Sequence, residues 1–413
     1  MSGPELITLG CRLNLAESDA MRMLAGDQDD LIIVNSCAVT NEAVRQTRQA
    51  IRKAHRARPE ARIVVTGCAA QVEPEAFAAM PEVSFVFGNA EKSSLASFAR
   101  RGDAEKVRVA DVFAIGEPPQ PVTGFSDRTR AFVQVQNGCD HRCTFCIIPY
   151  GRGDSRSVPA GLVIDRIKAL VDDGIAEVVL TGVDVTSYGP DLPGGPTLGL
   201  LVERILRHVP DLRRLRLSSI DSVEIDGRLE EIICQEPRFM PHLHLSLQAG
   251  DDMILKRMKR RHSRAQAVAA VARLKAKRPE IAIGADLIAG FPTETEQMAA
   301  NSLSLIDDCD IVMGHIFPYS AKAGTPAARM PQVAPAVIKE RAARLRAAAA
   351  ARKAKWMQGL VGAHSRVLVE RSGDHGHGED FAPVRLLAAE TPGTIVPVRL
   401  GAVVDGKLTG ARM

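Results

Sequence analysis

About a third of the way along, the chain reads Ala131-Phe132-Val133-Gln134-Val135-Gln136-Asn137-Gly138-Cys139-Asp140-His141-Arg142-Cys143-Thr144-Phe145-Cys146. The stretch begins with a mainly apolar run that is typical of a strand. Three cysteines follow in the spacing Cys-x-x-x-Cys-x-x-Cys, all within eight residues. Thiolates select zinc, copper(I) or iron–sulfur clusters. We therefore expect a metal site in the loop after a strand, with Cys139, Cys143 and Cys146 as ligands.

The number of cysteines in this loop distinguishes between two kinds of metal site. A structural zinc site has four closed ligands, usually from two separated cysteine pairs, and no matching pair follows here. Three ligands in one short loop suit a 4Fe–4S cluster with one iron left open for another ligand. The alternative is a zinc site completed by His141 or by a distant residue. The spacing favours the iron–sulfur cluster.

Length and composition indicate an ordinary globular chain. Its 413 residues suffice for two or three domains, since domains run to about 100–200 residues. Charged residues make up 25% and hydrophobic residues 46%, as in soluble proteins. The net charge of +4 permits a nucleic-acid partner but does not by itself argue for one. Eight cysteines are too few for a disulfide scaffold. No signal peptide and no long apolar span is visible, so we expect a cytoplasmic protein without a membrane partner.

The first hundred residues alternate between short strand-like and helix-like segments. Strand candidates lie at 6–9, 31–34, 63–65 and 85–87, and a helix candidate at 42–57. This alternation predicts an open parallel α/β sheet.

Three further cysteines follow the first three of these strands. They are Cys11, Cys37 and Cys68. Because ligands bind beyond the carboxyl ends of strands in such sheets, we expect the three thiols to meet at one sheet edge. The alternative is three unrelated buried cysteines. Repetition at the same structural point favours a second metal site.

The rest of the chain divides into two further parts. Six strand candidates, at 132–135, 178–180, 215–218, 243–247, 281–288 and 311–317, alternate with helix candidates at 160–171, 198–208 and 265–277. They predict an open (β/α)6 partial barrel with its active site at the carboxyl ends of the strands. A Pro-rich linker at 116–128 precedes it and a helix at 337–356 follows. Strand-like runs at 365–370 and 394–400 predict a small antiparallel β-barrel, and we place His375 and His377 in a surface loop of it. The expected domains are 1–115, 125–350 and 353–413.

With both cysteine sets placed, the chain resembles the methylthiotransferases, a branch of the radical S-adenosylmethionine (SAM) enzymes. The resemblance covers essentially the whole chain. It is carried by Gly10-Cys11-Arg12-Leu13-Asn14, by the segments 35–43 and 67–69, by the cysteine loop, and by the segments 149–153, 286–295 and 317–320.

The resemblance implies the cofactors and the chemistry. It implies one 4Fe–4S cluster on Cys139, Cys143 and Cys146, with SAM chelated to its open iron, and a second 4Fe–4S cluster on Cys11, Cys37 and Cys68. In that family, electron transfer to SAM yields a 5′-deoxyadenosyl radical that abstracts hydrogen from the substrate carbon. The second cluster supplies sulfur and a second SAM the methyl group. The C-terminal barrel would be the RNA-binding TRAM type.

The resemblance also implies contacts to SAM and the nucleoside. We expect them from seven residues: Phe145, Gly182, Asp184, Ser218, Ser246, Asp286 and Gly290. Gly182 and Asp184 lie in the turn after the second barrel strand, where the family contacts the methionyl amino group. Phe145 should pack near the adenine of SAM. A plain strand-ending turn remains an alternative for Asp184, and serine is common at strand ends.

Three substrate classes share this architecture. Two are adenosines at position 37 of tRNA, which carry either a threonylcarbamoyl or an isopentenyl group, and the third is an aspartate of a small-subunit ribosomal protein. The segments 37–42 and 255–261 look like the threonylcarbamoyladenosine type. The implied partners are the tRNA anticodon loop and a low-potential electron donor such as a flavodoxin or ferredoxin. The basic segment 256–261 could meet phosphates or be a solvated helix face. A non-catalytic RNA-binding protein with zinc or a structural cluster is the rival class.

Overall fold

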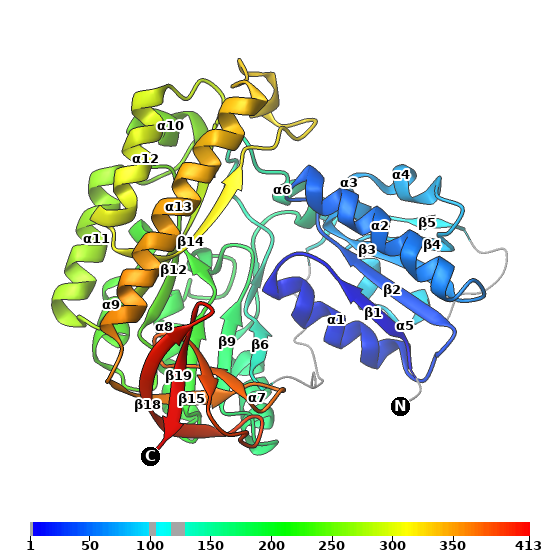
Figure 1. Cartoon of the computed structure of the whole chain (residues 1–413). Helices are drawn as coiled ribbons and strands as arrows, with labels where there is room; N and C mark the ends of the chain where they lie inside the picture. The colour runs from blue at the N-terminus through cyan, green and yellow to red at the C-terminus, as the bar shows by residue number, and fades with distance from the viewer. Residues whose placement is uncertain (1–2, 99–104, 117–128) are drawn as a thin grey trace.

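The computed structural model describes residues 3–98, 105–116 and 129–413. Residues 117–128 of the expected linker lie outside these ranges. Figure 1 shows an N-terminal sheet beside a larger central sheet, with a small barrel below the central sheet.

The N-terminal sheet is parallel, as predicted, and has the order β1-β2-β3-β4-β5. Its strands are β1 Glu5–Thr8, β2 Leu31–Ser36, β3 Arg62–Gly67, β4 Phe85–Phe87 and β5 Val107–Arg108. The helices between them are α1 Arg12–Ala25, α2 Asn41–Ala57, α3 Cys68–Val72, α4 Pro74–Ala78 and α5 Leu95–Phe98. The first four strands were predicted from the sequence, whereas β5, which has only two residues, was not.

Strand β2 shows why helices cover both faces of this sheet. All six of its residues are buried. Ile32 and Val34 join the core that includes residues of α2, whereas Leu31 and Ile33 join the core that includes residues of α1. Successive strand residues point to opposite faces, so a continuous apolar run is what a strand between two helical layers requires.

The central sheet is also parallel and contains all six predicted strands. They are β6 Ala131–Gln134, β9 Glu177–Thr181, β10 Arg214–Leu217, β12 His242–Gln248, β13 Ala282–Ala289 and β14 Ile311–Pro318. The short strand β11, Ser219–Ile220, continues β10 and pairs with β12, so the order is β6-β9-β10/β11-β12-β13-β14. Its outer face carries α7 Ala160–Asp172, α8 Leu198–His208, α9 Gly227–Gln235, α11 Arg264–Lys277, α12 Glu296–Asp308 and α13 Pro335–Gly359. This is the predicted open (β/α)6 partial barrel.

The two faces of the central sheet differ in polarity. Leu215 and Leu217 of β10 belong to the apolar core beneath the helices. Arg216 and Ser218 alternate with them and therefore lie on the concave face. Asp286 alternates in the same way with core residues of β13. The concave face is thus polar, as a site for charged ligands requires.

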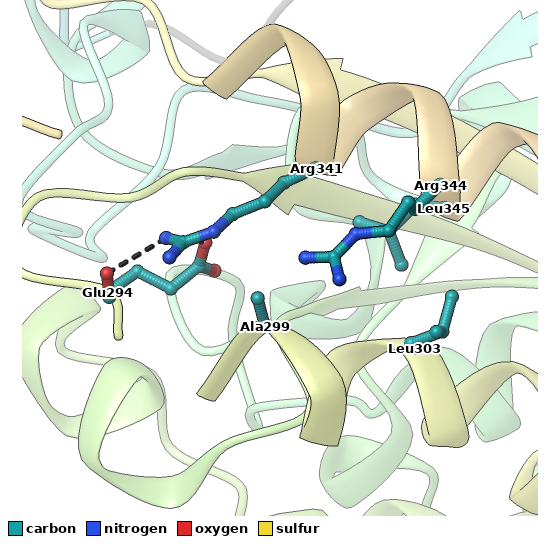
Figure 2. A pocket seen from close by; sticks show the side chains of 6 residues that line it. All are labelled: Glu294, Ala299, Leu303, Arg341, Arg344 and Leu345. Carbon is teal, nitrogen blue, oxygen red and sulfur yellow. Dashed lines mark hydrogen bonds and ion pairs between the residues drawn. The ribbon is translucent and has the colours of Figure 1, made fainter. Parts of the chain in front are cut away.

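Helix α13 closes the outer layer against α12. Arg341 of α13 meets Glu294, which precedes α12, at 3.0 Å, and both side chains are buried. Figure 2 shows this ion pair above a small pocket lined by Ala299, Leu303 and Leu345. Burial raises the pKa of Glu294, although the Gly290 amide and the charge of Arg341 act in the opposite direction.

The C-terminal unit is a closed five-stranded barrel of order β15-β16-β17-β19-β18. Its strands are β15 His364–Val369, β16 His375–His377, β17 Pro383–Leu386, β18 Ile395–Val404 and β19 Lys407–Arg412. The predicted barrel is confirmed, but β17 and β19 pair in parallel, so it is not wholly antiparallel. The placement of His375 and His377 in a surface loop was wrong: they form β16, where His377 meets Glu370 at 2.9 Å.

The C-terminal barrel docks on the amino ends of the central strands. Phe381 stacks on His242, the first residue of β12, with 5.1 Å between ring centroids. The guanidinium groups of Arg130 and Arg216 lie 5.2 and 5.0 Å from the Phe381 ring. Arg216 also donates to the carbonyl of Glu379 at 2.9 Å. The carboxyl ends, where the cysteine loop lies, are at the opposite side.

None of the helices among the described residues combines the length and the apolar character that a membrane span needs.

Candidate functional site

The structure brings Cys11, Cys37 and Cys68 together at the carboxyl edge of the N-terminal sheet. Cys11 caps α1, Cys37 follows β2, and Cys68 begins α3 directly after β3. A side chain on Gly10 would come within 3.0 Å of the Cys37 sulfur. Burial raises the pKa of Cys37 to about 11, and the thiols of Cys68 and Cys11 act in the same direction.

Gly67 explains how Cys68 reaches this edge. Its φ of 92° is rarely adopted by residues with a side chain, and a Cβ there would lie 2.5 Å from the Ser36 carbonyl oxygen. The close turn from β3 into α3 therefore requires glycine. It leaves the Cys68 thiol beside the end of β2, where Cys37 follows.

The second triad forms a compact loop at the carboxyl end of β6. The Cys139 amide donates to the Gly153 carbonyl at 3.1 Å, and the Cys146 amide donates to that of Cys143 at 3.0 Å. Burial raises the pKa of Cys146 to about 12, and the nearby thiols of Cys143 and Cys68 act in the same direction. The involvement of Cys68 shows that the two triads lie near each other.

The chain after Cys146 joins the two sheets. Ile147 lies in the same core as Cys68, and Ile148 packs against that core from the start of α6, Ile148–Arg152. A Cβ on Gly151 would lie 3.3 Å from the Cys68 Cβ, which measures how closely α6 approaches α3. The space between the triads is thus bordered by apolar side chains.

Arg152 anchors this contact through a buried network. Its Nε donates to the Cys68 sulfur at 3.2 Å, and its other nitrogens bind Glu17 at 2.6 Å and Asn14 at 2.6 Å. Glu17 also meets Lys92 at 2.7 Å. Against the cost of burial, the charges of Arg152 and Lys92 hold the pKa of Glu17 at about 2. Two cations around one carboxylate leave a positive charge beside the sulfur of Cys68.

The spacing of the thiols bears on the kind of metal. Among the described residues, the groups whose ligand atoms all lie within 4.8 Å are Cys139–His141–Asp184 and His244–Asp286–His315, and neither cysteine triad is one of them. A single zinc ion with Zn–S bonds of about 2.3 Å needs its ligand atoms about 4 Å apart. Three thiols with a wider spacing suit a cluster of several metal ions. The donor chemistry of both triads therefore fits an iron–sulfur cluster.

Two cysteines outside the triads serve as a comparison. Cys309 is buried in the apolar core of the central sheet, and Cys234 packs against that core. Burial raises the pKa of Cys309 to about 12. Burial alone therefore does not distinguish a ligand, whereas convergence with two other thiols does.

Gln136 ties the first cysteine to the turn that follows β9. Its side-chain oxygen accepts from the amides of Val183 and Asp184 at 3.0 and 2.9 Å, and its nitrogen donates to the Gly138 carbonyl at 2.8 Å. A Cβ on Gly182 would lie 2.8 Å from Gln136, so this position requires glycine. Asp184 thereby reaches the Cys139 sulfur at 3.6 Å.

Ser218 and Ser246 lie on the concave face, near the carboxyl ends of β10 and β12. Within the part of the chain that the structure describes, the buried Ser218 hydroxyl and the Gln134 amide nitrogen have no hydrogen-bond partner. Buried polar atoms normally have one, so these two fit a site for a polar ligand. Ser246 offers its carbonyl to Arg260 at 2.9 Å.

Within the basic segment 256–261, neither expected role, phosphate binding or a solvated helix face, fits Arg260. It is neither a solvated cation nor free for phosphate, because it pairs with Asp221 at 2.6 Å and reaches the Cys143 sulfur at 3.7 Å. Lys256, Lys259 and Arg261 remain exposed.

Phe145 and Gly290 are held by packing. The Phe145 ring meets that of Phe291 edge-on, with centroids 6.3 Å apart. Gly290 has a φ of 71°, and a Cβ there would lie 2.6 Å from Ile338 of α13. Its glycine is therefore explained by helix packing, while its amide donates to Glu294 at 2.9 Å.

Asp286 lies on the concave face with two histidines. Its carboxylate meets His244 at 2.9 Å and His315 at 3.3 Å, and these hydrogen bonds hold the pKa of Asp286 well below its usual range despite burial. Asp286 was predicted as a site residue, but the two histidines, which come from the neighbouring strands β12 and β14, were not. Gln136 and Arg152 were not predicted as site residues, and Arg260 was considered only as part of the basic segment 256–261. In the sequence, these residues share only one feature, a polar side chain within or beside an apolar segment. Without the fold, this feature is too common to identify a site residue.

Comparisons with known proteins agree with this arrangement. Residues 133–306 match the model of the radical SAM superfamily, and residues 5–88 match the uncharacterized protein family UPF0004. The chain is 48% identical, over 97% of its length and 96% of the relative, to the threonylcarbamoyladenosine tRNA methylthiotransferase MtaB of Rickettsia prowazekii. The chain belongs to the radical SAM methylthiotransferase family. It is therefore a transferase that works with SAM and two [4Fe–4S] clusters, which confirms the predicted enzyme class and cofactors.

Further matches extend the comparison. The protein of the same name from Bacillus subtilis is 36% identical over 82% of this chain and 78% of its own length. A tRNA-2-methylthio-N6-dimethylallyladenosine synthase of Erythrobacter litoralis is 33% identical over 89% of this chain and 86% of its own length. Among solved structures, the radical SAM methyltransferase TsrM of Kitasatospora setae aligns with a TM-score of 0.57 at 15% identity, covering 79% of this chain and 77% of that one. This last match supports the fold.

Proposed function

We propose that this protein adds a methylthio group to carbon 2 of N6-threonylcarbamoyladenosine at position 37 of tRNA. The observation that carries the proposal is the approach of two cysteine triads across the contact of α3 with α6. A sulfur-bearing cluster on one triad and a SAM-binding cluster on the other would both border the space where the substrate base must lie. The substrate follows from the name of the relatives that are 48% and 36% identical.

We assign the ligands by the position of each triad. Cys139, Cys143 and Cys146 lie at the carboxyl end of the central barrel, where the radical SAM fold holds its substrate-activating cluster. The other three, Cys11, Cys37 and Cys68, would hold the auxiliary cluster. When bound, SAM and the two clusters supply radical chemistry at an unactivated carbon together with the sulfur and the methyl group.

The protein's own residues prepare this site. Gln136 fixes the turn that carries Asp184 beside Cys139, so a cationic amino group of SAM would find a carboxylate there. Ser218, Ser246 and Asp286 line the concave face below. Ile147 and Ile148 exclude water between the triads, which protects reactive intermediates.

Arg152 offsets negative charge where thiolates gather. Its hydrogen bond to the Cys68 sulfur would stabilise the thiolate form, and hydrogen bonds to ligand sulfurs tune the potential of a cluster. Each expected domain would bind one component: residues 1–115 the auxiliary cluster, residues 125–350 SAM, and residues 353–413 RNA.

A hollow on the N-terminal unit supports a nucleic-acid partner. It is lined by Arg45, Arg48 and Arg52, which lie on one face of α2. Each pairs with a glutamate (Glu42, Glu73 and Glu82), but the arginines are at least partly exposed, unlike Arg260, and such surface pairs are weak enough for a phosphate to replace them. It adjoins a second hollow lined by Ala38, Ile147 and Lys322, next to the candidate ligands Cys37 and Cys68. Arginines bind phosphates of the RNA backbone, so an anticodon loop laid along α2 would point toward the triads.

The reaction also implies its surroundings in the cell. Cleavage of SAM requires an electron from a low-potential donor, such as a flavodoxin or ferredoxin. A tRNA partner and such a donor place the reaction in the cytoplasm.

The test uses purified protein reconstituted with iron and sulfide under anaerobic conditions. It is incubated with SAM, a reductant and one of three substrates: an anticodon stem-loop with threonylcarbamoyladenosine, one with isopentenyladenosine, or the small-subunit ribosomal protein. We expect mass spectrometry to find the methylthio group on the first. Reaction with the second or third alone overturns the substrate assignment, and zinc without iron in the purified protein would support the rival class of non-catalytic RNA-binding proteins.

A further inference from the structure

The substrate proposed above differs from its closest rival by a charge. The threonylcarbamoyl group carries a carboxylate, whereas the isopentenyl group is uncharged. Carbon 2 and the N6 arm flank the same ring nitrogen of adenine, so the arm lies beside the reacting carbon. A residue that distinguishes the two substrates should therefore be a cation next to the space between the triads.

Arg12 occupies such a position. It follows the candidate ligand Cys11 and is the first residue of α1. Asn14 fixes this turn of the helix, because its amide donates to the carbonyls of Leu9 at 2.7 Å and Ser36 at 3.1 Å and its oxygen accepts from Arg152. Helix α1 packs along the edge strand β6, and its N-terminal end faces the open side of the central barrel (Figure 1).

The Arg12 guanidinium lies within electrostatic range of charged groups of the central barrel. The charged groups that act on it are those of Arg130, Arg216, Asp286 and Glu177. Burial lowers the pKa of Arg12, and the cations Arg130 and Arg216 act in the same direction. An arginine nevertheless stays protonated at neutral pH.

Arg12 differs from its basic neighbours in having no anion of its own. Arg130 and Arg216 meet Glu177 at 2.9 and 3.0 Å, and Arg214 meets it at 3.6 Å. No hydrogen bond or ion pair joins Arg12 to the other described residues. Asp286 already binds two histidines. A partly buried guanidinium without a partner, among other cations, makes this part of the concave face suitable for an incoming anion.

We propose that Arg12 binds the carboxylate of the threonyl group and so selects this nucleoside over the uncharged one. The inference rests on the proposed function and names the residue behind its substrate choice. Guanidinium and carboxylate match in a two-pronged hydrogen bond, which lysine cannot reproduce. A site built to bind a charged group rejects analogues that lack it, because its own polar group then stays unpaired.

The experiment compares RNAs that differ only in the arm. One stem-loop carries threonylcarbamoyladenosine, and a second carries the same arm with its carboxylate converted to the neutral amide. The proteins are the unaltered chain, Arg12→Gln, Arg12→Lys and Arg22→Gln, the last being an exposed arginine of the same helix. The readouts are kcat and KM, the affinity for each RNA without SAM, and the iron content.

We expect Arg12→Gln to lower kcat/KM on the acid by about tenfold to a hundredfold, mainly through KM, and to weaken binding of that RNA by a similar factor. The amide RNA should be a poor substrate for the unaltered chain and should respond little to the substitution. Arg12→Lys should fall in between, and Arg22→Gln should behave as the unaltered chain does.

Two outcomes overturn the inference while leaving the proposed function intact. One is that the unaltered chain treats acid and amide alike. The other is an equal loss on both RNAs in the Gln variant with its iron retained. If the Gln variant loses iron, Arg12→Lys replaces it, and an equal loss on both RNAs again decides against the inference. If the unaltered chain modifies neither RNA, the proposed function itself fails.

Discussion

Arg152 is buried where the two triads approach, and it links Cys68 to Glu17, Asn14 and Asn137. It therefore acts both on the auxiliary thiols and on the contact of the two sheets. We expect Arg152→Met to destabilise the protein by about 3–5 kcal/mol, since it leaves a buried carboxylate with one cation fewer. Without the donor to sulfur, the reduction potential of the auxiliary cluster should also fall. Urea denaturation and a redox titration followed by electron paramagnetic resonance measure the two effects.

Arg142 provides the control for this prediction. It lies in the same cysteine loop but is exposed, and it pairs with Asp154 at 2.6 Å, also at the surface. Exposed pairs contribute about 0–1 kcal/mol, so Arg142→Met should change neither stability nor potential much. Equal effects of the two substitutions would contradict the role given to Arg152.

At this scale the sequence predicted which cysteines come together better than it predicted the residues that support them. Six cysteines could be grouped because their spacing and their places after strands repeat. Gln136 and Arg260 could not, because their contacts join segments far apart in sequence, such as Arg260 with Cys143. The roles of Phe145 and Gly290 as cofactor contacts remain predictions, since packing against Phe291 and Ile338 accounts for both positions.

Helix α2 shows how one element would guide the RNA. Arg45, Arg48 and Arg52 line one hollow, and replacing all three by glutamine should weaken stem-loop binding. If each meets one phosphate, the slope of log affinity against log salt should become shallower by about 2. Fluorescence anisotropy over a series of salt concentrations measures this slope.

The matched control replaces three exposed arginines on and after α8, which are Arg204, Arg207 and Arg213. These lie on the outer layer of the central barrel, away from the cysteine loop. Their replacement lowers the net charge equally and should leave the slope nearly unchanged. The same change of slope in both proteins would mean that only net charge matters.

Element types were predictable where apolar residues repeat with a clear period. The six central strands are apolar on one side, so their type and order could be predicted, as could the helices α7, α8, α11 and α13. Helices α9 and α12 were not among the predicted helices. Strand β5 has two residues and gave no such pattern. The parallel pairing of β17 with β19 depends on barrel closure, which no local pattern records.

In the whole molecule, the cysteine loop and the C-terminal barrel lie at opposite ends of the central strands. Phe381 joins the C-terminal barrel to these strands, lying against His242 and between Arg130 and Arg216. Loss of a fully buried ring costs about 3–5 kcal/mol. Because Phe381 is half-buried, we expect Phe381→Ala to destabilise the protein by about half of that. Limited proteolysis should then release the C-terminal barrel more readily.

Leu387→Ala is the control in the same barrel, because this side chain is 69% exposed. It should change stability by less than about 0.5 kcal/mol. If Phe381→Ala were equally mild, the barrel would not be docked through this ring. Both variants can be compared by urea denaturation and by the rate of tryptic cleavage after α13.

The central claim is that the two triads together transfer a methylthio group to threonylcarbamoyladenosine in tRNA. Its most direct test is mass spectrometry of tRNA nucleosides from a host that makes both hypermodified adenosines but lacks its own methylthiotransferases. The host would express either this chain or its Cys143→Ala variant. We expect the methylthio form of threonylcarbamoyladenosine with the unaltered chain and its loss in the variant. Unchanged nucleosides, from a protein shown to hold both clusters, would contradict the account.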